Sequence, residues 1–321
     1  MRNETAPLVS VVCLCYNHAA TVAQSIEIVL SQQTDFPFEL IVHDDASTDG
    51  SADIIRAYAE KYPGTVVPVL QTENRFSSCN LAETYIAPLL RGTYVAICEG
   101  DDYWTVPDKL QVQTDLMRAD PEITMCFHAV EELSGEAVSV FRPCKADGPV
   151  PSSLIVRRGG MFCPSASLMV RRDIADLWPE FRKAADVYDY PLQVLAAAKG
   201  KVWYTDRVMA AYRFRLAGSW TAQHADATDY AHIENETRWL GMFGEYTGGA
   251  FQTDIDYHLA HLWFTEYRKS PSKEKLAGLR EYRGRLAFKD RAVFTGLTAL
   301  YRLFGTRADR LYLFIKKQML K

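Results

Sequence analysis

Short apolar runs alternate with amphipathic stretches along the first hundred residues of the chain. Four runs rich in Val, Ile and Leu predict strands, at residues 8–15, 38–43, 65–70 and 93–98. Apolar side chains at helical spacing predict helices between them, at residues 20–33, 52–62 and 80–91. Because these strands are apolar throughout and alternate with helices, they predict a parallel sheet covered on both faces. The predicted fold class is therefore α/β.

The pattern is less regular after residue 104. Further helices are predicted at residues 107–118 and 189–199, and further strands at residues 123–130, 162–172 and 202–208. Gly, Pro and Ser are frequent over residues 134–152, which we expect to form a loop. From about residue 223 the pattern is helical to the end. We therefore expect one domain over residues 1–222 and a mostly helical region over residues 223–321.

Polar residues follow three of the predicted strands. They are Tyr16-Asn17, Asp44-Asp45 and Glu99-Gly100-Asp101-Asp102. In open α/β sheets, ligands bind in a crevice at the carboxyl ends of the strands. We therefore expect all three groups to line one crevice.

The acidic group at residues 99–102 has two interpretations. It is either a solvated acidic turn or a site for a divalent cation, with Gly100 allowing the backbone to turn tightly. Mg²⁺ and Mn²⁺ prefer oxygen ligands, often one or two carboxylates together with substrate phosphates. A bound cation would also offset the mutual repulsion of the carboxylates.

Two other acidic positions have a structural alternative. Asp44-Asp45 could form a turn and cap the next helix, although Ser47, Thr48 or Asp49 would already suffice as the cap. Asp189 could cap the helix at 190–199, or it could enter a pocket and act as a general base.

Composition excludes several classes of protein. Hydrophobic residues make up 48% of 321 residues, which is enough for a large core, and the net charge of -4 gives no support for nucleic-acid binding. No run of about 18 apolar residues predicts a membrane-spanning helix, and the first residues do not resemble a signal peptide. The seven cysteines include no CxxC pair, which predicts reduced thiols and a cytoplasmic protein. Neither a GxGxxG nor a GxxxxGK[ST] loop occurs, which disfavours a dinucleotide-binding or P-loop enzyme.

The last forty residues are basic and amphipathic. Residues 283–321 contain ten Lys or Arg against two Asp, interleaved with Phe, Leu, Tyr and Ile. This pattern is typical of a segment that binds an anionic membrane surface, which would place the protein at the inner face of the cell membrane. It is equally typical of a helical pair that packs on the main domain and has a basic outer face.

Several stretches together resemble the family 2 glycosyltransferases of GT-A fold. They are PLVSVVCLCYN, the SQQ of the following helix, ELIVHDDASTDGS and GTYVAICEGDDYWTVPDKLQ, in that order. The likeness covers about residues 7–222. It implies an inverting transferase, of hexosyl or N-acetylhexosaminyl type, that uses a nucleotide-diphosphate sugar. A UDP-sugar is the expected donor.

The resemblance implies a role for the residues at each strand end. The region of Tyr16 and Asn17 would hold the base and ribose of the donor together with Asp45, with Asp44 beside them. Asp101 and Asp102 match the DXD-type motif of the family, and Glu99 occupies its outer position. Asp102 would bind the Mn²⁺ or Mg²⁺ that bridges the diphosphate, and Asp101 would lie near the ribose or the metal.

The resemblance also points to the general base. VYDYPLQVLAAAKGKVWYTDRVMAAYR fits the arrangement in relatives that place a carboxylate before a helix, and it points to Asp189. Here Tyr188 precedes the base where relatives have Glu or Gly. Many relatives also have a His shortly after the YR pair, whereas this chain has Arg215, which would pair with phosphate oxygens.

Three other functions are alternatives to a glycosyltransferase. A sugar nucleotidyltransferase would have a Gly-rich basic loop after the first strand, which CYNHAAT does not provide. The alternatives outside that class are a non-catalytic partner in glycan assembly that keeps the fold, and a module that docks on a membrane or partner through its basic tail. The expected acceptor is a glycan or lipid-linked glycan in bacterial surface-polysaccharide or glycolipid assembly, on the strength of the family alone.

Overall fold

The computed structural model describes residues 6–76, 80–213, 230–309 and 311–312. The chain divides into two compact units, which are Met1–Ile155 with Gly160–Ala227 and Val156–Gly159 with Thr228–Lys321. The boundary predicted at residue 222 lies outside the described residues and stays a prediction. None of the helices described is both long enough and apolar enough to cross a membrane.

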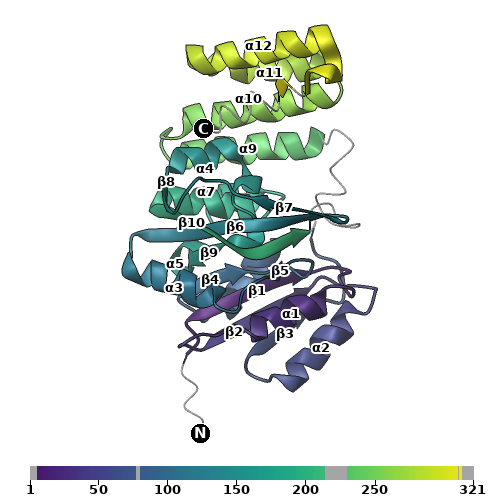
Figure 1. Ribbon diagram of the computed structural model, residues 1–321, viewed down its shortest axis with the longest axis vertical. Helices are drawn as coiled ribbons and strands as arrows, with labels where there is room; N and C mark the ends of the chain where they lie inside the picture. The colour runs from purple at the N-terminus through teal and green to yellow at the C-terminus, as the bar shows by residue number, and fades with distance from the viewer. Residues whose placement is uncertain (1–5, 77–79, 214–229, 310, 313–321) are drawn as a thin grey trace. The chain divides into compact units, whose positions relative to one another are not determined.

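The first unit is built on one mixed sheet (Figure 1). Its strands are β1 Val9–Cys15, β2 Phe38–Asp44, β3 Val66–Leu70, β4 Tyr94–Ile97, β5 Tyr103–Trp104, β6 Ile123–Ser134, β7 Ala137–Phe141, β8 Gly148–Val150, β9 Met169–Arg171 and β10 Lys201–Arg213. The main order is β3-β2-β1-β4-β9-β6-β10-β5, with β7 beside β6 and β8 beside β10. Strand β3 is therefore at the edge, where a strand that contains Pro68 can lose a hydrogen bond without cost to a neighbour.

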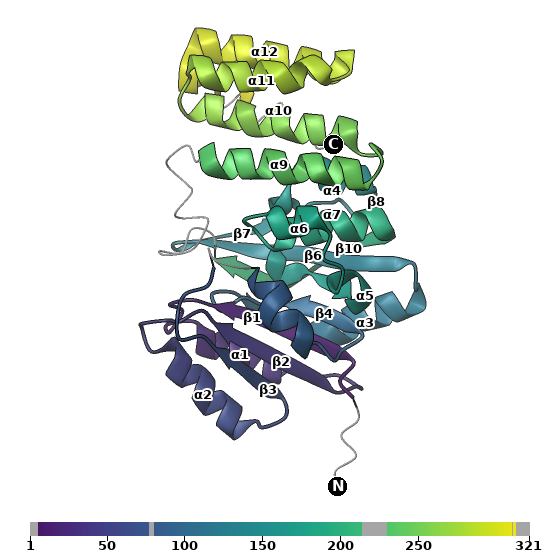
Figure 2. The same ribbon diagram turned by 180° about the vertical axis from the view of Figure 1, so that it is seen from behind.

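The helices of the first unit connect these strands. They are α1 Val22–Leu30, α2 Ser51–Lys61, α3 Lys109–Ala119, α5 Arg172–Ala175, α6 Glu180–Ala184 and α7 Asp189–Lys199, while α4 Ser152–Arg158 begins in the first unit and ends in the second. The second unit contains α9 Tyr230–Tyr246, α10 Gln252–Lys269, α11 Lys273–Arg285 and α12 Phe288–Phe304, which lie one beside the next (Figure 2). The described elements confirm the predicted α/β fold and the helical C-terminal region.

The parallel arrangement predicted for the first four strands is confirmed, and the later strands make the sheet mixed. Strands β1, β2, β3 and β4 are parallel, as are β6 and β10, but β9 runs antiparallel between β4 and β6. The short strand β5 is also antiparallel to β10. A short apolar run has the same sequence pattern in either direction, so only the path of its connections decides its orientation.

Three predicted segments differ from the structure. The strand expected at 162–172 is limited to β9, because residues 160–162 and 165–167 form 3₁₀ turns and the Ser167 hydroxyl donates to the Pro164 carbonyl instead. The loop expected at 134–152 contains β7 and β8, with Gly135 at φ 59° in the turn that joins β6 to β7. The helix expected at 80–91 is a π-helical turn followed by a 3₁₀ turn that contains Pro88.

Alternation along β1 supplies side chains to both faces of the sheet. Val11 packs in a large cluster with Ile26 of α1 and Ile55 of α2. Val12 points the other way and packs in a second cluster with Ile86. The helical cover on both faces explains why strand β1 is apolar throughout. Cys79 lies outside the described residues, and the other six cysteines are free thiols, as predicted.

Gly92 leads into β4 at a place where the backbone of β1 leaves no room for a side chain. A Cβ atom at this position would lie 2.4 Å from the Ser10 nitrogen and 2.7 Å from the Val9 carbonyl carbon. The Gly92 amide donates to the Ser10 hydroxyl at 2.8 Å. Since β1 is held between two strands, these backbone atoms cannot move aside.

We expect Gly92→Ala to lower the free energy of unfolding by about 1–3 kcal/mol, the usual cost of overpacking. Thermal unfolding followed by circular dichroism measures the change. Gly241→Ala is the control, because a Cβ there meets no atom within 4 Å and lies in helix α9. An equal effect of the two substitutions would contradict the packing argument.

Candidate active site

The three polar strand ends lie side by side. Strand β1 pairs in parallel with β2 on one side and with β4 on the other, so that their carboxyl ends meet at one edge. The Gly100 amide donates to the Leu14 carbonyl at 2.9 Å, and the Asn17 amide donates to the Ser47 hydroxyl at 2.8 Å. These bonds join the segments after β4, β1 and β2 into one site, as the sequence predicted.

An acidic cluster follows β4. One carboxylate oxygen each from Glu99, Asp101 and Asp102 lies within 4.8 Å of the others. Asp102 is buried, while Glu99 and Asp101 are partly buried. One oxygen of Asp102 accepts a hydrogen bond from the Arg213 amide at 2.9 Å, and the other oxygen is buried without a partner among the described residues. An unpaired buried carboxylate oxygen is costly unless a ligand completes it.

Helix α1 holds the backbone of this acidic turn. The Thr21 hydroxyl donates to the Gly100 carbonyl at 2.8 Å, and the Ser25 hydroxyl donates to the Asp102 carbonyl at 2.6 Å. These bonds satisfy the carbonyl groups of the turn from the side of the helix. The carboxylates are thereby positioned before any ligand binds.

Arg213, at the end of β10, contacts the same turn from the opposite direction. Its guanidinium donates to the Asp101 carbonyl and to the Gln24 side chain, and lies 4.8 Å from the centre of the Tyr103 ring. The family resemblance predicted a phosphate-binding cation two residues later, at Arg215, which lies outside the described residues. Arg213 was missed because only the pairing of β10 with β5 brings residue 213 close to residue 102.

The close approach of the carboxylates changes their protonation. Burial raises the pKa of Asp102 well above its usual value, and the charges of Asp101 and Glu99 raise it further. Burial, Asp101 and Asp189 together raise the pKa of Glu99 to about 8, against the effect of the Ser165 hydroxyl, which donates to it at 3.0 Å. A divalent cation would relieve this accumulation of negative charge.

His18 is a second residue that sequence analysis did not assign. Its Nε2 lies 3.9 Å from an oxygen of Asp101. A Cβ atom at position 100 would lie 2.8 Å from His18 Nδ1 and 3.2 Å from the Leu14 carbonyl oxygen. The close packing of the His18 ring and of β1 therefore favours glycine at position 100.

Asp45 and Asp44 lie at the end of β2, and both are buried. The two oxygens of Asp45 accept the backbone amides of Arg75 and Phe76 at 2.8 and 3.0 Å. Asp44 accepts both the amide and the hydroxyl of Ser47. Both carboxylates therefore shape the surrounding loops, and the donor contacts expected of them stay predictions.

Tyr16 and Asn17 follow β1. The Tyr16 side chain is exposed, and Asn17 adopts a left-handed conformation with φ 57°. The Asn17 side-chain oxygen accepts the Thr48 amide at 2.8 Å. Asn is one of the few residues that tolerate this backbone geometry, because its short side chain forms local hydrogen bonds. The exposed Tyr16 ring is thus presented at the strand edge where the donor is expected.

Asp189 is brought to the acidic cluster by the fold. It is the first residue of α7, and Tyr188 occupies the N-cap position, so the alternative of an Asp189 cap is wrong. Its Oδ2 accepts the Gln193 amide at 3.3 Å. Its charge contributes to the raised pKa of Glu99, 90 residues earlier in the chain. A carboxylate at this place can accept a proton next to the cluster.

Tyr188, which precedes Asp189, contacts the loop at Arg75 and Phe76, whose amides donate to Asp45. The Tyr188 ring meets the Phe76 ring edge-on, with centroids 5.8 Å apart. The Leu81 amide donates to the Tyr188 hydroxyl at 3.4 Å. Phe76 remains 46% exposed, so an aromatic surface faces solvent beside Asp189.

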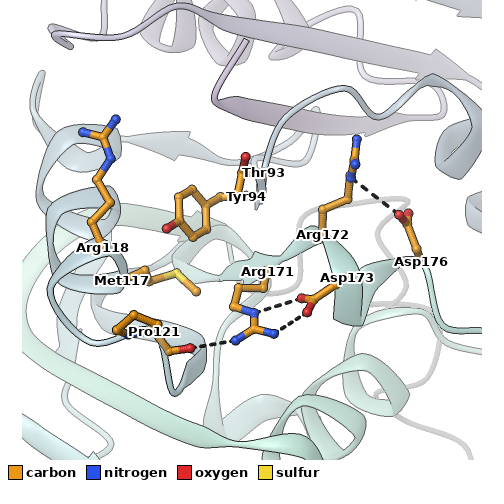
Figure 3. Close-up of a pocket in the computed structure, with 9 residues that line it drawn as sticks. All are labelled: Thr93, Tyr94, Met117, Arg118, Pro121, Arg171, Arg172, Asp173 and Asp176. Carbon is orange, nitrogen blue, oxygen red and sulfur yellow. Dashed lines mark hydrogen bonds and ion pairs between the residues drawn. The ribbon is translucent and has the colours of Figure 1, made fainter. Parts of the chain in front are cut away.

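A separate pocket of about 570 Å³ lies near the start of β4, away from Glu99 at its other end (Figure 3). Arg171 donates to Asp173 and to the Pro121 carbonyl, and Arg172 pairs with Asp176 at 3.6 Å. Each of these two cations already has an acidic partner. The pocket is therefore a poor match for an anionic donor.

Part of this chain matches the sequence model of a known protein family. Glycosyl transferase family 2 matches residues 10–174, which is slightly more than half of the chain. An uncharacterised protein of Mycobacterium tuberculosis is 32% identical over 235 residues, which cover 73% of this chain and 65% of that protein. The Escherichia coli UDP-Glc:alpha-D-GlcNAc-diphosphoundecaprenol beta-1,3-glucosyltransferase WfaP is 30% identical over 114 residues, which cover 35% of this chain and 42% of WfaP.

Two solved structures share the fold. TarS 1-349 of S. aureus, in complex with UDP-GlcNAc, has a TM-score of 0.63 at 13% identity and aligns over 94% of this chain and 91% of its own. The mannosyltransferase PcManGT from Pyrobaculum calidifontis, in complex with GDP-Man and Mn²⁺, has a TM-score of 0.53 at 16% identity, over 94% and 88% of the two chains. These likenesses confirm the GT-A-like fold that the sequence resemblance implied.

The raised pKa of Glu99 makes stability depend on pH. Between about pH 4.5 and 8 the folded protein keeps Glu99 protonated while the unfolded chain loses the proton, so the contribution of Glu99 to the free energy of unfolding falls as pH rises. We expect Glu99→Gln, measured in EDTA, to gain thermal stability relative to wild type from pH 5 to pH 8. Exposed Glu136→Gln serves as the control and should show no such trend. Parallel pH profiles for wild type and Glu99→Gln would contradict the assignment.

Proposed function

The chain belongs to glycosyltransferase family 2, and we propose that it transfers a sugar from a nucleotide-diphosphate donor to an acceptor hydroxyl with inversion. One observation carries this proposal: the buried Asp102 oxygen that has no partner among the described residues, in a cluster of three carboxylates. Such an arrangement is unfavourable by itself and becomes favourable when a cation and a diphosphate complete it.

The residues of the cluster fit Mn²⁺ or Mg²⁺. The cluster offers oxygen atoms and no sulfur or imidazole ligand, as hard divalent cations prefer. We assign Asp102 as the ligand and Asp101 as its support, and Glu99 lies beside them. When bound, the cation would neutralise the negative charge that develops on the leaving diphosphate.

The donor would lie along the ends of β1 and β2. Tyr16 presents an exposed ring, and Asn17, Asp44 and Asp45 shape the loops beside it. We propose a UDP-sugar, with the base and ribose at these residues and the diphosphate toward Asp101. The names of two related proteins support this choice, since WfaP uses UDP-Glc and TarS was crystallised with UDP-GlcNAc. Arg215 is proposed to pair with the phosphate oxygens.

Asp189 would be the general base. It would take the proton of the acceptor hydroxyl, whose oxygen would then bond to the anomeric carbon as the bond from that carbon to the diphosphate breaks. A single displacement of this kind inverts the anomeric configuration. Gln193 holds the carboxylate by donating to it, and the N-terminus of α7 favours its ionised form.

The acceptor would approach the side of Asp189. Phe76, whose ring meets that of the partly buried Tyr188, offers exposed aromatic surface there, which suits the apolar face of a sugar ring. We propose a glycan or lipid-linked glycan of bacterial surface-polysaccharide assembly as the acceptor. The acceptor in the name of WfaP, a diphosphoundecaprenol-linked sugar, supports this choice.

Loss of the cation ligand tests the metal assignment. With Mn²⁺ present, we expect the wild type to release nucleotide from one member of a panel of UDP-Glc, UDP-GlcNAc and GDP-Man. Asp102→Asn should lower that release by about 100-fold or more, as should EDTA, because the charge on the leaving diphosphate is no longer offset. Asp115→Asn, on the exposed side of α3, is the matched control.

A non-catalytic partner with this fold would release no nucleotide from any donor. Full turnover by Asp102→Asn would instead remove Asp102 from the site. The first result would favour the non-catalytic alternative over an enzyme. The second would remove the role assigned to Asp102 while leaving the chain an enzyme.

A second substitution separates binding from chemistry. We expect Asp189→Asn to bind the donor as tightly as wild type in calorimetry but to hydrolyse it about 10²–10⁴-fold more slowly, because water or the acceptor no longer loses its proton to a base. Asp173→Asn, in the separate pocket, should change neither quantity. Weaker donor binding with unchanged turnover would place Asp189 in donor recognition instead.

A further inference from the structure

Helix α12 has one face that packs and one that does not. Phe294 meets Tyr257 and Phe264 of α10, with ring centroids 5.4 and 6.1 Å apart, and Tyr301 also meets Phe264, at 5.6 Å. In the described part of residues 283–321, helix α12 therefore packs on α10 of its own unit, and the predicted packing of these helices on the main domain stays a prediction. The question is what the outward face is for.

The outward face of α12 exposes large apolar side chains. Phe288 is 85% exposed and Leu303 77%. Phe288 and Leu303 are joined along one side of the helix by the exposed small residues Ala292 and Ala299, at helical spacing. These side chains project from the surface instead of covering a core, which is a costly arrangement for a face that stays in water.

Four arginines lie beside this apolar strip. Arg280 and Arg283 come from α11, and Arg291 and Arg302 come from α12. Burial lowers the pKa of Arg283, and the positive charges of Arg280, Arg302 and Arg291 lower it further. Arg291 and Arg302 are exposed and lie, by helical spacing, on the side of α12 that carries Phe288 and Leu303. None of the four lies within ion-pair distance of a carboxylate in the part of the chain described.

The acidic residues of the same segment are used elsewhere. Asp290 pairs with Arg157 at 2.5 Å, and Asp309 pairs with Arg268 at 3.3 Å and accepts the Tyr301 hydroxyl. Both carboxylates are thus neutralised by cations outside α12. The outward face keeps a local excess of positive charge next to exposed apolar side chains.

We propose that this basic–apolar face, formed by Arg280, Arg283, Arg291 and Arg302 with Phe288 and Leu303, docks on an anionic lipid bilayer. Charge complementarity selects the occupant: clustered guanidinium groups without acidic partners favour a surface of phosphate groups. The projecting Phe and Leu side chains suit insertion at the boundary between head groups and acyl chains. A helix that lies in the interface needs this pairing of cations with an apolar strip, and α12 with its neighbour α11 supplies both (Figure 2).

The test uses the full chain without donor or metal, so that its result is independent of the proposed transferase activity. We expect sedimentation with vesicles that contain phosphatidylglycerol, little sedimentation with phosphatidylcholine alone, and weaker binding as NaCl is raised. Arg291→Gln/Arg302→Gln should lower the partition coefficient about 30-fold, because each cation near an anionic surface contributes a factor of about five. Phe288→Ser/Leu303→Ser should lower it by about tenfold or more.

Matched controls exist in the first unit. Arg56→Gln/Lys61→Gln removes two exposed cations of α2, and Val138→Ser/Val140→Ser removes two exposed apolar side chains of β7. Neither control should change the partition coefficient. Because the substituted side chains are exposed, circular dichroism should show an unchanged fold in every variant.

Two results would overturn the proposal. One is equal sedimentation of wild type and both test variants on either kind of vesicle. The other is a wild-type dimer in light scattering that becomes monomeric in Phe288→Ser/Leu303→Ser and binds no vesicles, since the face would then join two copies of the chain.

Discussion

The site is organised around the repulsion between carboxylates at the end of β4. Glu99, Asp101 and Asp102 lie within a few ångströms of one another in a partly buried turn, where burial and neighbouring negative charge raise the pKa of Asp102 and of Glu99. The surrounding structure offsets this strain by fixing the turn: hydroxyls of α1 bind its carbonyls, and the Arg213 amide binds one carboxylate. A turn held this firmly is prepared for a ligand that supplies positive charge.

The sheet is what makes the site possible. Three parallel strands end at one edge and deliver their polar loops to a shared place, while helices on both faces bury the apolar strands. The antiparallel insertion of β9 then joins the second half of the sheet to β4. Ser165, just before β9, thereby reaches Glu99, and the start of α7 brings Asp189 to the same cluster.

The two units divide the proposed work. The first would hold the donor, the cation and the base. The second uses its acidic residues to anchor its own helices and leaves arginines and apolar side chains facing outward. Transfer to a lipid-linked acceptor would require the enzyme to stay near a bilayer, so the two proposals support each other while each stands on separate residues.

The sequence by itself determined the α/β fold, the positions of the first four strands and the acidic group after β4, because strand apolarity and strand-end polarity are local properties. Through a family resemblance it also pointed to Asp189 as the general base, which stays a prediction. Only the tertiary structure decided the direction of β9 and the roles of Arg213, His18 and Ser165, since each contacts the turn across 66 to 112 residues of sequence or through the packing of a glycine. Contacts at that range depend on how strands are ordered in the sheet, and a strand's own residues do not specify its neighbours.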